Sequence, residues 1–345
     1  MTNFLKADFN AETDSLSSLC FAHLFDETVI DGKQFSNLTL APNLPAIHIG
    51  YGAYAYLFKG CKFIENAPDL SSAVLVEEIN GEKVSHDCAF MYAFENCKSL
   101  KQLPSLPAET LSAACYLGMF KGCSSIQNIE GSEYALPAMT LAESCYECMF
   151  EDCTSMILPP SLPATTFEYT DENDETTTAD CCYRGMFMGC TKLYVAPKLP
   201  AASSTPIYNE DETKITGYKQ EEGLDLAVGC YQSMFENCKQ LEATPELTTI
   251  RLKESCYESM FKGCSKLSIA SELRAGYYNP ETWPPTYGNL DQYCYKSMFE
   301  DCTSLIISPT IHASDDVSDK TQAFAYMFKG CSNLRYIDIY ISQFP

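Results

Sequence analysis

The hydrophobic residues of this chain fall into a short block that recurs ten times, with variable insertions between the copies. A clear copy is CYLGMFKGCSSI, in which the apolar positions are Cys115, Tyr116, Met119, Phe120 and Cys123. The spacing i, i+1, i+4, i+5 and i+8 predicts one face of a two-turn helix. The phenylalanine of the block recurs every 26 to 48 residues, so a constant unit carries insertions of different length.

The residues after this apolar run predict the end of the helix and a short strand beyond it. Gly122, Asp152 and Asn237 each precede the second cysteine of a unit, and these residue types tolerate the left-handed conformation that ends helices. A short extended run comes next, and in most units a proline stands seven residues after the cysteine. Because proline cannot donate to a β-ladder, the strand should be short. Such a unit cannot bury two faces alone, but stacked units can.

The pattern MFMGCTKLYVAPKLPA, which starts at Met186, resembles the BspA-type leucine-rich repeat family. Members of that family carry an Ala-Phe-x-x-Cys-x-x-Leu core and are mostly surface proteins of bacteria and some protozoa. The resemblance extends over nearly the whole chain. It implies a repeat scaffold and brings no catalytic signature with it.

The expected fold class is α/β: a right-handed leucine-rich-repeat solenoid of about ten helix-strand units, with a parallel sheet on one side and the insertions on one edge. We expect a single domain over residues 1–345. Its repeat cores are expected near residues 20–28, 53–70, 89–106, 115–129, 145–162, 182–199, 230–247, 256–273, 294–311 and 323–341.

Sixteen of the nineteen cysteines occupy two columns of the repeat, seven in a first column and nine in a second column eight residues later. Eight residues span about 12 Å of helix, which is too far for a disulfide within one unit. We interpret both columns as small buried side chains rather than metal or redox groups, since alanine replaces cysteine at Ala53, Ala89 and Ala323. Only Cys88, Cys148 and Cys181 lie outside the columns and remain free to carry chemistry.

Two more columns are expected to hold the stack together. An aromatic residue follows the first-column position in all ten units, and its constant phase predicts a ladder in the core or at its boundary rather than a sugar-binding strip. The position two residues before the second-column cysteine alternates in charge, as at Glu95, Lys121 and Glu151, with Met188 as the exception. This alternation predicts ion pairs between neighbouring turns that set their register.

The amino-acid composition argues against two classes of binding partner. The chain has 23 Lys and Arg against 46 Asp and Glu, and the net charge of -23 argues against nucleic acid or anionic lipid as a partner. No apolar run is close to the length of a membrane-spanning helix, and the first residues carry no export signal.

The sequence also indicates no metal site. The acidic run 168–175 is interpreted as a solvated loop, because Thr176 and Cys182 stand where an EF-hand needs glycine and glutamate. The scattered histidines form no metal or triad spacing, so no cofactor or metal is expected.

The long insertions are the expected recognition surface, since variable loops on a rigid repeat scaffold usually carry binding. They span residues 71–87, 165–180, 202–229, 274–293 and 313–322. One of them holds five aromatic residues that serve either as a contact patch or as a cover for the solenoid edge: Tyr277, Tyr278, Trp283, Tyr287 and Tyr293. Residues five positions after the second-column cysteine, such as Ile269 and Ile307, are expected to point inward with the leucine two residues earlier.

These patterns predict a non-enzymatic protein. The first hypothesis is a bacterial cell-surface or secreted protein that mediates protein binding or adhesion, with a host or matrix protein as partner. The alternative is a structural component of a phage virion or similar particle, made without a signal peptide and bound to other particle subunits. The apolar C-terminal run IDIYISQFP also predicts self-association through the C-terminal edge.

Overall fold

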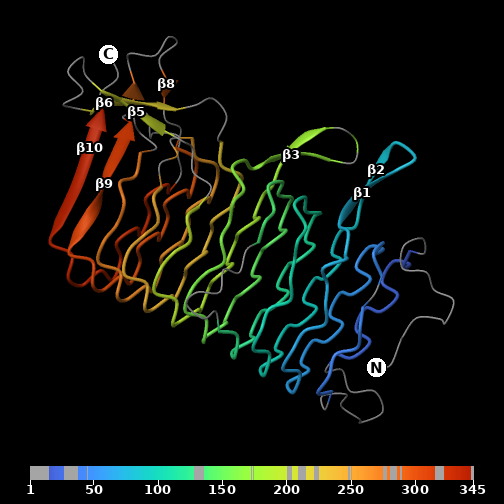
Figure 1. The fold of residues 1–345 in the computed structure, drawn as a ribbon. Coiled ribbons are helices and arrows are strands. Elements are labelled where there is room, and N and C mark those ends of the chain that lie inside the picture. Colours follow the sequence, from blue (N-terminus) through green and yellow to red (C-terminus); the bar gives the residue numbers. More distant parts are fainter. Residues whose placement is uncertain are drawn as a thin grey trace.

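The computed structural model describes residues 15–26, 38–44, 46–127, 136–171, 173, 175–199, 204–208, 215–220, 225–247, 249, 251–274, 278–279, 286–287, 290–314 and 322–342. Each repeat contributes one coil, and the coils stack side by side in chain order (Figure 1). The N-terminal and C-terminal coils therefore lie at opposite ends of the stack. One buried hydrophobic cluster runs through it from Leu16 to Met327.

The repeat blocks contain no helix in the described residues, so the predicted α/β class with ten helix-strand units is wrong. The N–H of Met119 donates to the carbonyl of Tyr116, three residues earlier, at 3.1 Å. The next N–H, of Phe120, donates to Met149 in the following coil at 3.0 Å. A helix would instead bond each N–H to the carbonyl four residues earlier. Alternate amides thus close a turn within one coil and join that coil to the next.

Left-handed residues occur at every fourth position of a block, for example Ala114 (φ 51°), Gly118 (φ 57°) and Gly122 (φ 72°). The sequence predicted one such residue per unit, at the end of a helix. The apolar spacing suits a backbone with a period of four residues as well as a helix with 3.6, so the spacing alone does not decide between them. Because a left-handed residue other than glycine costs about 1–2 kcal/mol, the bonds between coils must offset that strain.

The predicted continuous parallel sheet is also absent from the described residues. One parallel pair joins β9 (Ile307–Ser314) to β10 (Tyr336–Ser342) at the C-terminal end. Elsewhere successive coils meet through isolated parallel bridges, such as those between Asn66 and Gln102 and between Ala243 and Ile269. A proline near these bridges, as at Pro104, has no N–H to extend a ladder. No helix in the described part of the chain is long and apolar enough to cross a membrane.

Within the described residues the insertions carry four antiparallel hairpins, which rise from the same edge of the stack (Figure 1). They are β1 (Val76–Ile79) with β2 (Glu82–Ser85), β3 (Glu168–Thr170) with β4 (Thr176–Thr178), β5 (Ser204–Tyr208) with β6 (Ile215–Gln220), and β7 (Tyr278–Asn279) with β8 (Thr286–Tyr287). Asn80 and Gly81 both have positive φ in the β1–β2 turn, as a two-residue hairpin requires.

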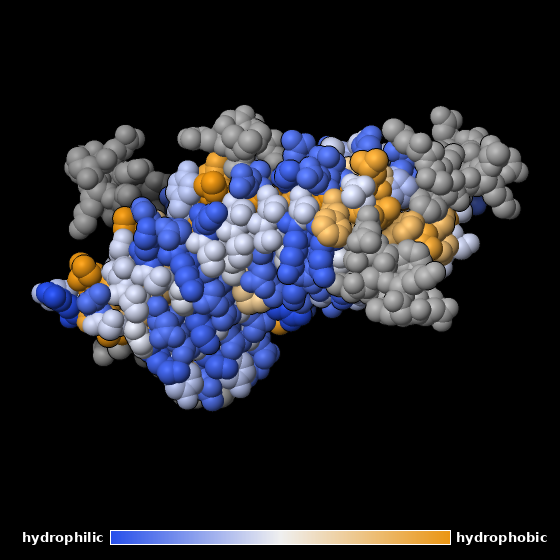
Figure 2. Space-filling model, turned by 90° about the horizontal axis from the view of Figure 1, so that it is seen from below, coloured by the Kyte–Doolittle hydropathy of each residue, from blue (hydrophilic) through white to orange (hydrophobic). Residues whose placement is uncertain are grey.

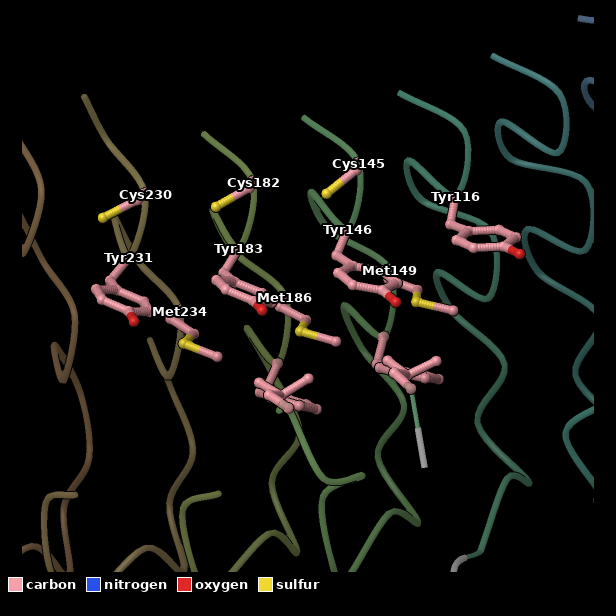
Figure 3. Packing of buried hydrophobic residues seen from close by; sticks show 14 of the residues in the cluster. Tyr116, Cys145, Tyr146, Met149, Cys182, Tyr183, Met186, Cys230, Tyr231 and Met234 are labelled. Carbon is pink, nitrogen blue, oxygen red and sulfur yellow. The ribbon is translucent and has the colours of Figure 1, made fainter. Parts of the chain in front are cut away.

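Two aromatic ladders fill the core. The tyrosine rings of successive coils lie nearly parallel and offset, with 5.9 Å between the centroids of Tyr146 and Tyr183 (Figure 3). The phenylalanines form a second ladder, in which Phe150 and Phe187 are 5.9 Å apart. The predicted ladder is confirmed, and it lies in the core, because Tyr146 and Tyr183 are at most 2% exposed. Each stacked pair contributes about 0.5–1.5 kcal/mol beyond its buried area.

The two cysteine columns are buried except at the ends of the stack, where Cys20 is exposed and Cys331 half-buried. Every second-column thiol donates to the phenylalanine carbonyl of the preceding coil, as Cys123 does to Phe94 at 3.0 Å. The interpretation of these cysteines as small buried side chains was therefore incomplete, since each thiol also acts as a weak hydrogen-bond donor. First-column thiols bond within their own coil, as Cys115 does to Ser112, which explains why alanine is accepted there.

Candidate interaction surface

The C-terminal half of the stack exposes a column of hydrophobic side chains four and five residues after the second-column cysteine. We call it the apolar strip, and it consists of Tyr194, Val195, Ile269, Ile306, Ile307 and Tyr336. The coil between Val195 and Ile269 interrupts it, because Glu242 and Ala243 stand at these positions. Ile269 is 65% exposed, Ile307 is 57% exposed and Tyr336 is 66% exposed. Parallel pairing of Ile307 with Tyr336 and of Ala243 with Ile269 places the column residues of neighbouring coils side by side.

The expectation that these residues point inward is wrong. It assumed an extended chain from the buried Leu305 to Ile307, in which residues two apart share a side. Instead Leu305 closes a turn, because its N–H donates to the carbonyl of Cys302 at 3.2 Å. Because the turn changes the direction of the backbone, residues two apart no longer share a side: Leu305 is buried and Ile307 faces outward.

The same column is polar in the second and third coils. Asn66 and Gln102 are exposed and pair in parallel, as Ile307 and Tyr336 do. Beside them, Lys101 Nζ lies 2.9 Å from a carboxylate oxygen of Glu65. One backbone position therefore presents amides and an ion pair at one end of the molecule and isoleucines at the other.

The N-terminal half has its own feature, an aromatic stack formed by His23, Tyr56 and Tyr92. The ring centroids of His23 and Tyr56 are 4.5 Å apart, and those of Tyr56 and Tyr92 are 5.2 Å apart. All three residues have positive φ. The stack ends at Gly118, where an added Cβ would lie 2.1 Å from the Tyr92 ring. The column was not identified from the sequence, although His23, Tyr56 and Tyr92 recur at one position of the repeat and could have revealed it.

The face-to-face geometry limits what this stack can bind. Most of the ring faces cover one another, so Tyr56 and Tyr92 are only half-exposed and present mainly their edges. Lys59 Nζ also lies 5.2 Å from the centroid of Tyr56 and bonds to Glu95 at 2.8 Å. A flat sugar or base would find no open aromatic platform between the rings.

The five aromatic candidates of the 274–293 insertion do not all come together in the described chain. Tyr277 and Trp283 lie outside the described residues. Tyr278 and Tyr287 are opposite partners on the β7–β8 hairpin. Tyr293 belongs to the coil that follows, at φ 59°, with Lys296 Nζ 4.8 Å from its ring centroid. Their role in partner contact remains a prediction.

The alternating charge column forms ion pairs between coils. Lys121 Nζ lies 2.7 Å from Glu151, and Glu300 lies between Lys262 at 3.6 Å and Lys329 at 2.6 Å. The carboxylates are more deeply placed than expected, since Glu151 is 8% exposed and Glu300 is 6% exposed. Lys329 lowers the pKa of Glu300 against the opposing effect of burial. The predicted pairing of neighbouring turns is confirmed at these positions.

The three cysteines outside the columns are not activated nucleophiles. All three occupy left-handed positions, with φ 57° at Cys88, 53° at Cys148 and 56° at Cys181. Burial raises the pKa of each thiol, and it raises the pKa of Cys148 to about 12 with help from the nearby Glu151. The thiolate is the reactive form, so these residues are mainly unreactive thiols at neutral pH.

Groups of ionisable residues on the hairpin edge have structural partners. Glu77 on β1 accepts from His86 at 2.7 Å and pairs with His48 at 2.8 Å. These contacts lower the pKa of Glu77, although burial acts in the opposite direction. The acidic run 168–175 forms the β3–β4 hairpin rather than a loop, and Asp171 accepts two backbone N–H groups in its turn. The described residues include no group of three or more His, Cys, Asp or Glu that could hold a metal ion.

The edge of the stack away from the hairpins is mostly hydrophilic, with hydrophobic groups at several places along it (Figure 2). β9 and β10 begin near this edge (Figure 1). No catalytic grouping emerges from the described residues, and the surface features with a distinct chemistry are the apolar strip, the aromatic stack and the hairpins.

No protein-family model matches the chain. No curated protein matches it either. Among solved structures, the chain is coarsely similar to a leucine-rich repeat protein from Bacteroides ovatus, with 15% sequence identity over 81% of this chain and 82% of that chain, at a TM-score of 0.20.

Proposed function

We propose that the chain is a non-enzymatic protein-binding scaffold of the BspA-type leucine-rich repeat kind, displayed on a bacterial surface or secreted, and that it binds a protein partner through the apolar strip. The exposed column of Ile269, Ile307 and Tyr336 is the observation that carries the proposal. Isolated exposed hydrophobic residues are common, but a row of them on adjacent coils marks a contact surface.

The scaffold suits this role for two reasons. Backbone hydrogen bonds and stacked rings join the coils that carry the strip. The strip is therefore already ordered before a partner binds, and binding costs it little conformational entropy. The polar residues of the same column, Asn66 and Gln102, leave the second and third coils without this surface. Binding is therefore expected at the C-terminal coils and not at these two.

The test measures binding of the purified chain to surfaces coated with fibronectin or with collagen, as representatives of matrix proteins. We expect Ile269→Glu and Ile307→Glu to reduce binding at least about tenfold, because each introduces a carboxylate that binding would desolvate. Gln102→Glu is the matched control, since it adds a charge at the same column position in a polar coil. Equal loss in all three variants, or no binding by the wild type to either coating, would count against the proposal.

The location needs a separate experiment on the native source. Antibodies against the chain should label intact cells, and the protein should be found in the cell-surface or secreted fraction. Recovery of the chain in purified virus-like particles instead would favour the alternative of a structural particle component.

A further inference from the structure

The two ends of the coil stack carry complementary backbone groups. Within the stack, alternate N–H groups of each coil donate to carbonyls of the next coil, as Tyr257 does to Cys294 at 3.0 Å. This direction never reverses along the blocks of the described chain. Along the blocks of the described residues the stack is therefore polar, with donors left over at one end and acceptors left over at the other.

The last coil presents the donors. In the described residues, the N–H groups of Phe324, Tyr326, Phe328 and Gly330 donate to no carbonyl, whereas their counterparts in the preceding coil do. The first coil presents the acceptors, because the carbonyls of Cys20, Ala22 and Leu24 receive no N–H from the described chain. In neighbouring coils these are the positions that bond to each other.

The side chains at the two ends match in the same register. Phe324 and Phe328 end the two aromatic ladders at one end, and Phe21 and Phe25 begin them at the other. The charge column ends with Lys329 and begins with Asp26, so its alternation of sign would continue from one copy to the next.

From these observations we propose that copies of this chain associate head to tail, with the C-terminal coil of one copy stacked on the N-terminal coil of another. Phe324, Tyr326 and Phe328 then donate to the carbonyls of Cys20, Ala22 and Leu24 of the next copy. Lys329 extends the charge column to Asp26 of that copy, which also pairs with His23 of its own coil at 2.6 Å. A head-to-tail contact of this kind does not close on itself, so assembly is open-ended.

A two-fold dimer through the C-terminal end is the competing arrangement. It would place the donors of one coil against the same donors of the other, with no acceptors between them. The exposed edge of β10 could pair in such a dimer, but the coil region from Phe324 to Gly330 would then bury unpaired N–H groups, which is costly. The backbone polarity thus favours head-to-tail stacking.

Sedimentation velocity of the full chain over a wide concentration range tests the proposal. The mean mass should rise continuously with concentration. Lys329→Glu and Asp26→Lys should each need about tenfold higher concentration for the same mean mass, because like charges would then meet at the junction. Lys198→Glu is the control, as an exposed lysine in the middle of the stack, and it should assemble like the wild type.

A mixture of the two end variants separates assembly from misfolding. Lys329→Glu chains and Asp26→Lys chains place opposite charges at every junction between the two variants, so an equimolar mixture should assemble at lower concentration than either variant alone. A wild type that stays monomeric, a mass that levels off at a dimer, or a mixture that fails to recover would each overturn the proposal. A monomer would mean that another protein, or this chain itself, covers the ends.

Discussion

The N-terminal and C-terminal halves of this molecule share one interior and differ in what they present outside. Phe94 and Phe261 occupy the same ladder position and are almost fully buried. Outside, Gln102 in one half corresponds to Ile269 in the other. A repeat fold can vary its surface in this way because the core is specified by other positions of each unit. The difference shows that the surface can change at residues that the stack does not need.

The second contrast concerns polar contacts between coils. From the fifth to the ninth coil the residue after the buried tyrosine joins coils through side chains, as Arg184 does with Glu147 at 2.9 Å and Lys296 with Glu258 at 2.9 Å. In the first four coils this position is apolar, as at Ala55, and the aromatic stack stands nearby. The two regions therefore use different chemistry to align their coils.

The largest expected effect is the loss of stability at alkaline pH. It tests whether the two halves have equivalent buried interiors. Burial holds the pKa of Cys145 at about 12, against an ordinary value of 9.0, and raises the pKa of Cys97 and Cys256. A raised folded-state pKa contributes stability that is complete below pH 9 and is lost as the pH rises toward the folded value. Each buried thiol should remove about 1.4 kcal/mol per pH unit above 9.

We therefore expect a cooperative loss of circular dichroism between about pH 9 and 11, together with thiolate absorbance. Trapping with iodoacetamide and peptide mapping should label both halves in the same pH range. Labelling of one half at a clearly lower pH would show that the interiors are not equivalent.

The next effect comes from truncating the phenylalanine ladder in each half. Phe94→Ala and Phe261→Ala should each reduce the free energy of unfolding by about 3–5 kcal/mol, because both remove a buried ring and leave a cavity. The stacked neighbours lie at similar distances, 5.2 Å from Phe58 to Phe94 and 5.6 Å from Phe261 to Phe299. Chemical denaturation measures both values, and a difference above about 2 kcal/mol would contradict a shared core.

A smaller difference in stability should distinguish the two halves when a glycine at positive φ is replaced by alanine. Both Gly118→Ala and Gly185→Ala place a Cβ at positive φ, which costs about 1 kcal/mol. Gly118→Ala also forces the Tyr92 ring to move, whereas at Gly185 the nearest atom is the Cys148 Sγ at 3.1 Å. The total for Gly118→Ala should therefore reach about 3 kcal/mol. Thermal unfolding measures the difference, and the double variant with Tyr92→Ala should abolish most of it.

The smallest effect concerns the charge column, which is interrupted at Met188. Lys121→Met should cost about 1 kcal/mol, the upper end of the range for exposed pairs, because it leaves the buried carboxylate of Glu151 without the ammonium at 2.7 Å. Met188→Lys should stabilise by a similar amount, since its column neighbours are Glu151 and Glu236. Both effects should shrink in high salt. A Met188→Lys variant that is destabilised would mean that packing, not charge, governs that position.

Much of the buried architecture could be predicted from the repeat. The ladder containing Tyr116 and the burial of Cys123 could be inferred from like residues recurring at one phase, because equivalent positions in stacked units meet each other. The aromatic stack of Tyr56 and Tyr92 was missed because its column changes to glycine, cysteine and serine in later repeats and returns to tyrosine only at Tyr326. The partial repetition hid a real contact.

The outward direction of Ile269 could not be obtained from strand periodicity, since the turn that ends at Leu267 shifts the phase of the following chain. The hydrogen bonds of the second-column thiols could not be predicted either, because the sequence does not show which carbonyl lies next to a buried cysteine.

By itself, the sequence determined which residues share a column and that these columns pack on one another, since repetition of a unit makes the environments of its copies equivalent. Only the tertiary structure decided the backbone conformation. The spacing from Cys115 to Cys123 suits a helix and a run of four-residue turns equally well at the level of side chains. The choice depends on where alternate N–H groups find acceptors, and the acceptors of Tyr116 and Phe120 belong to the next coil.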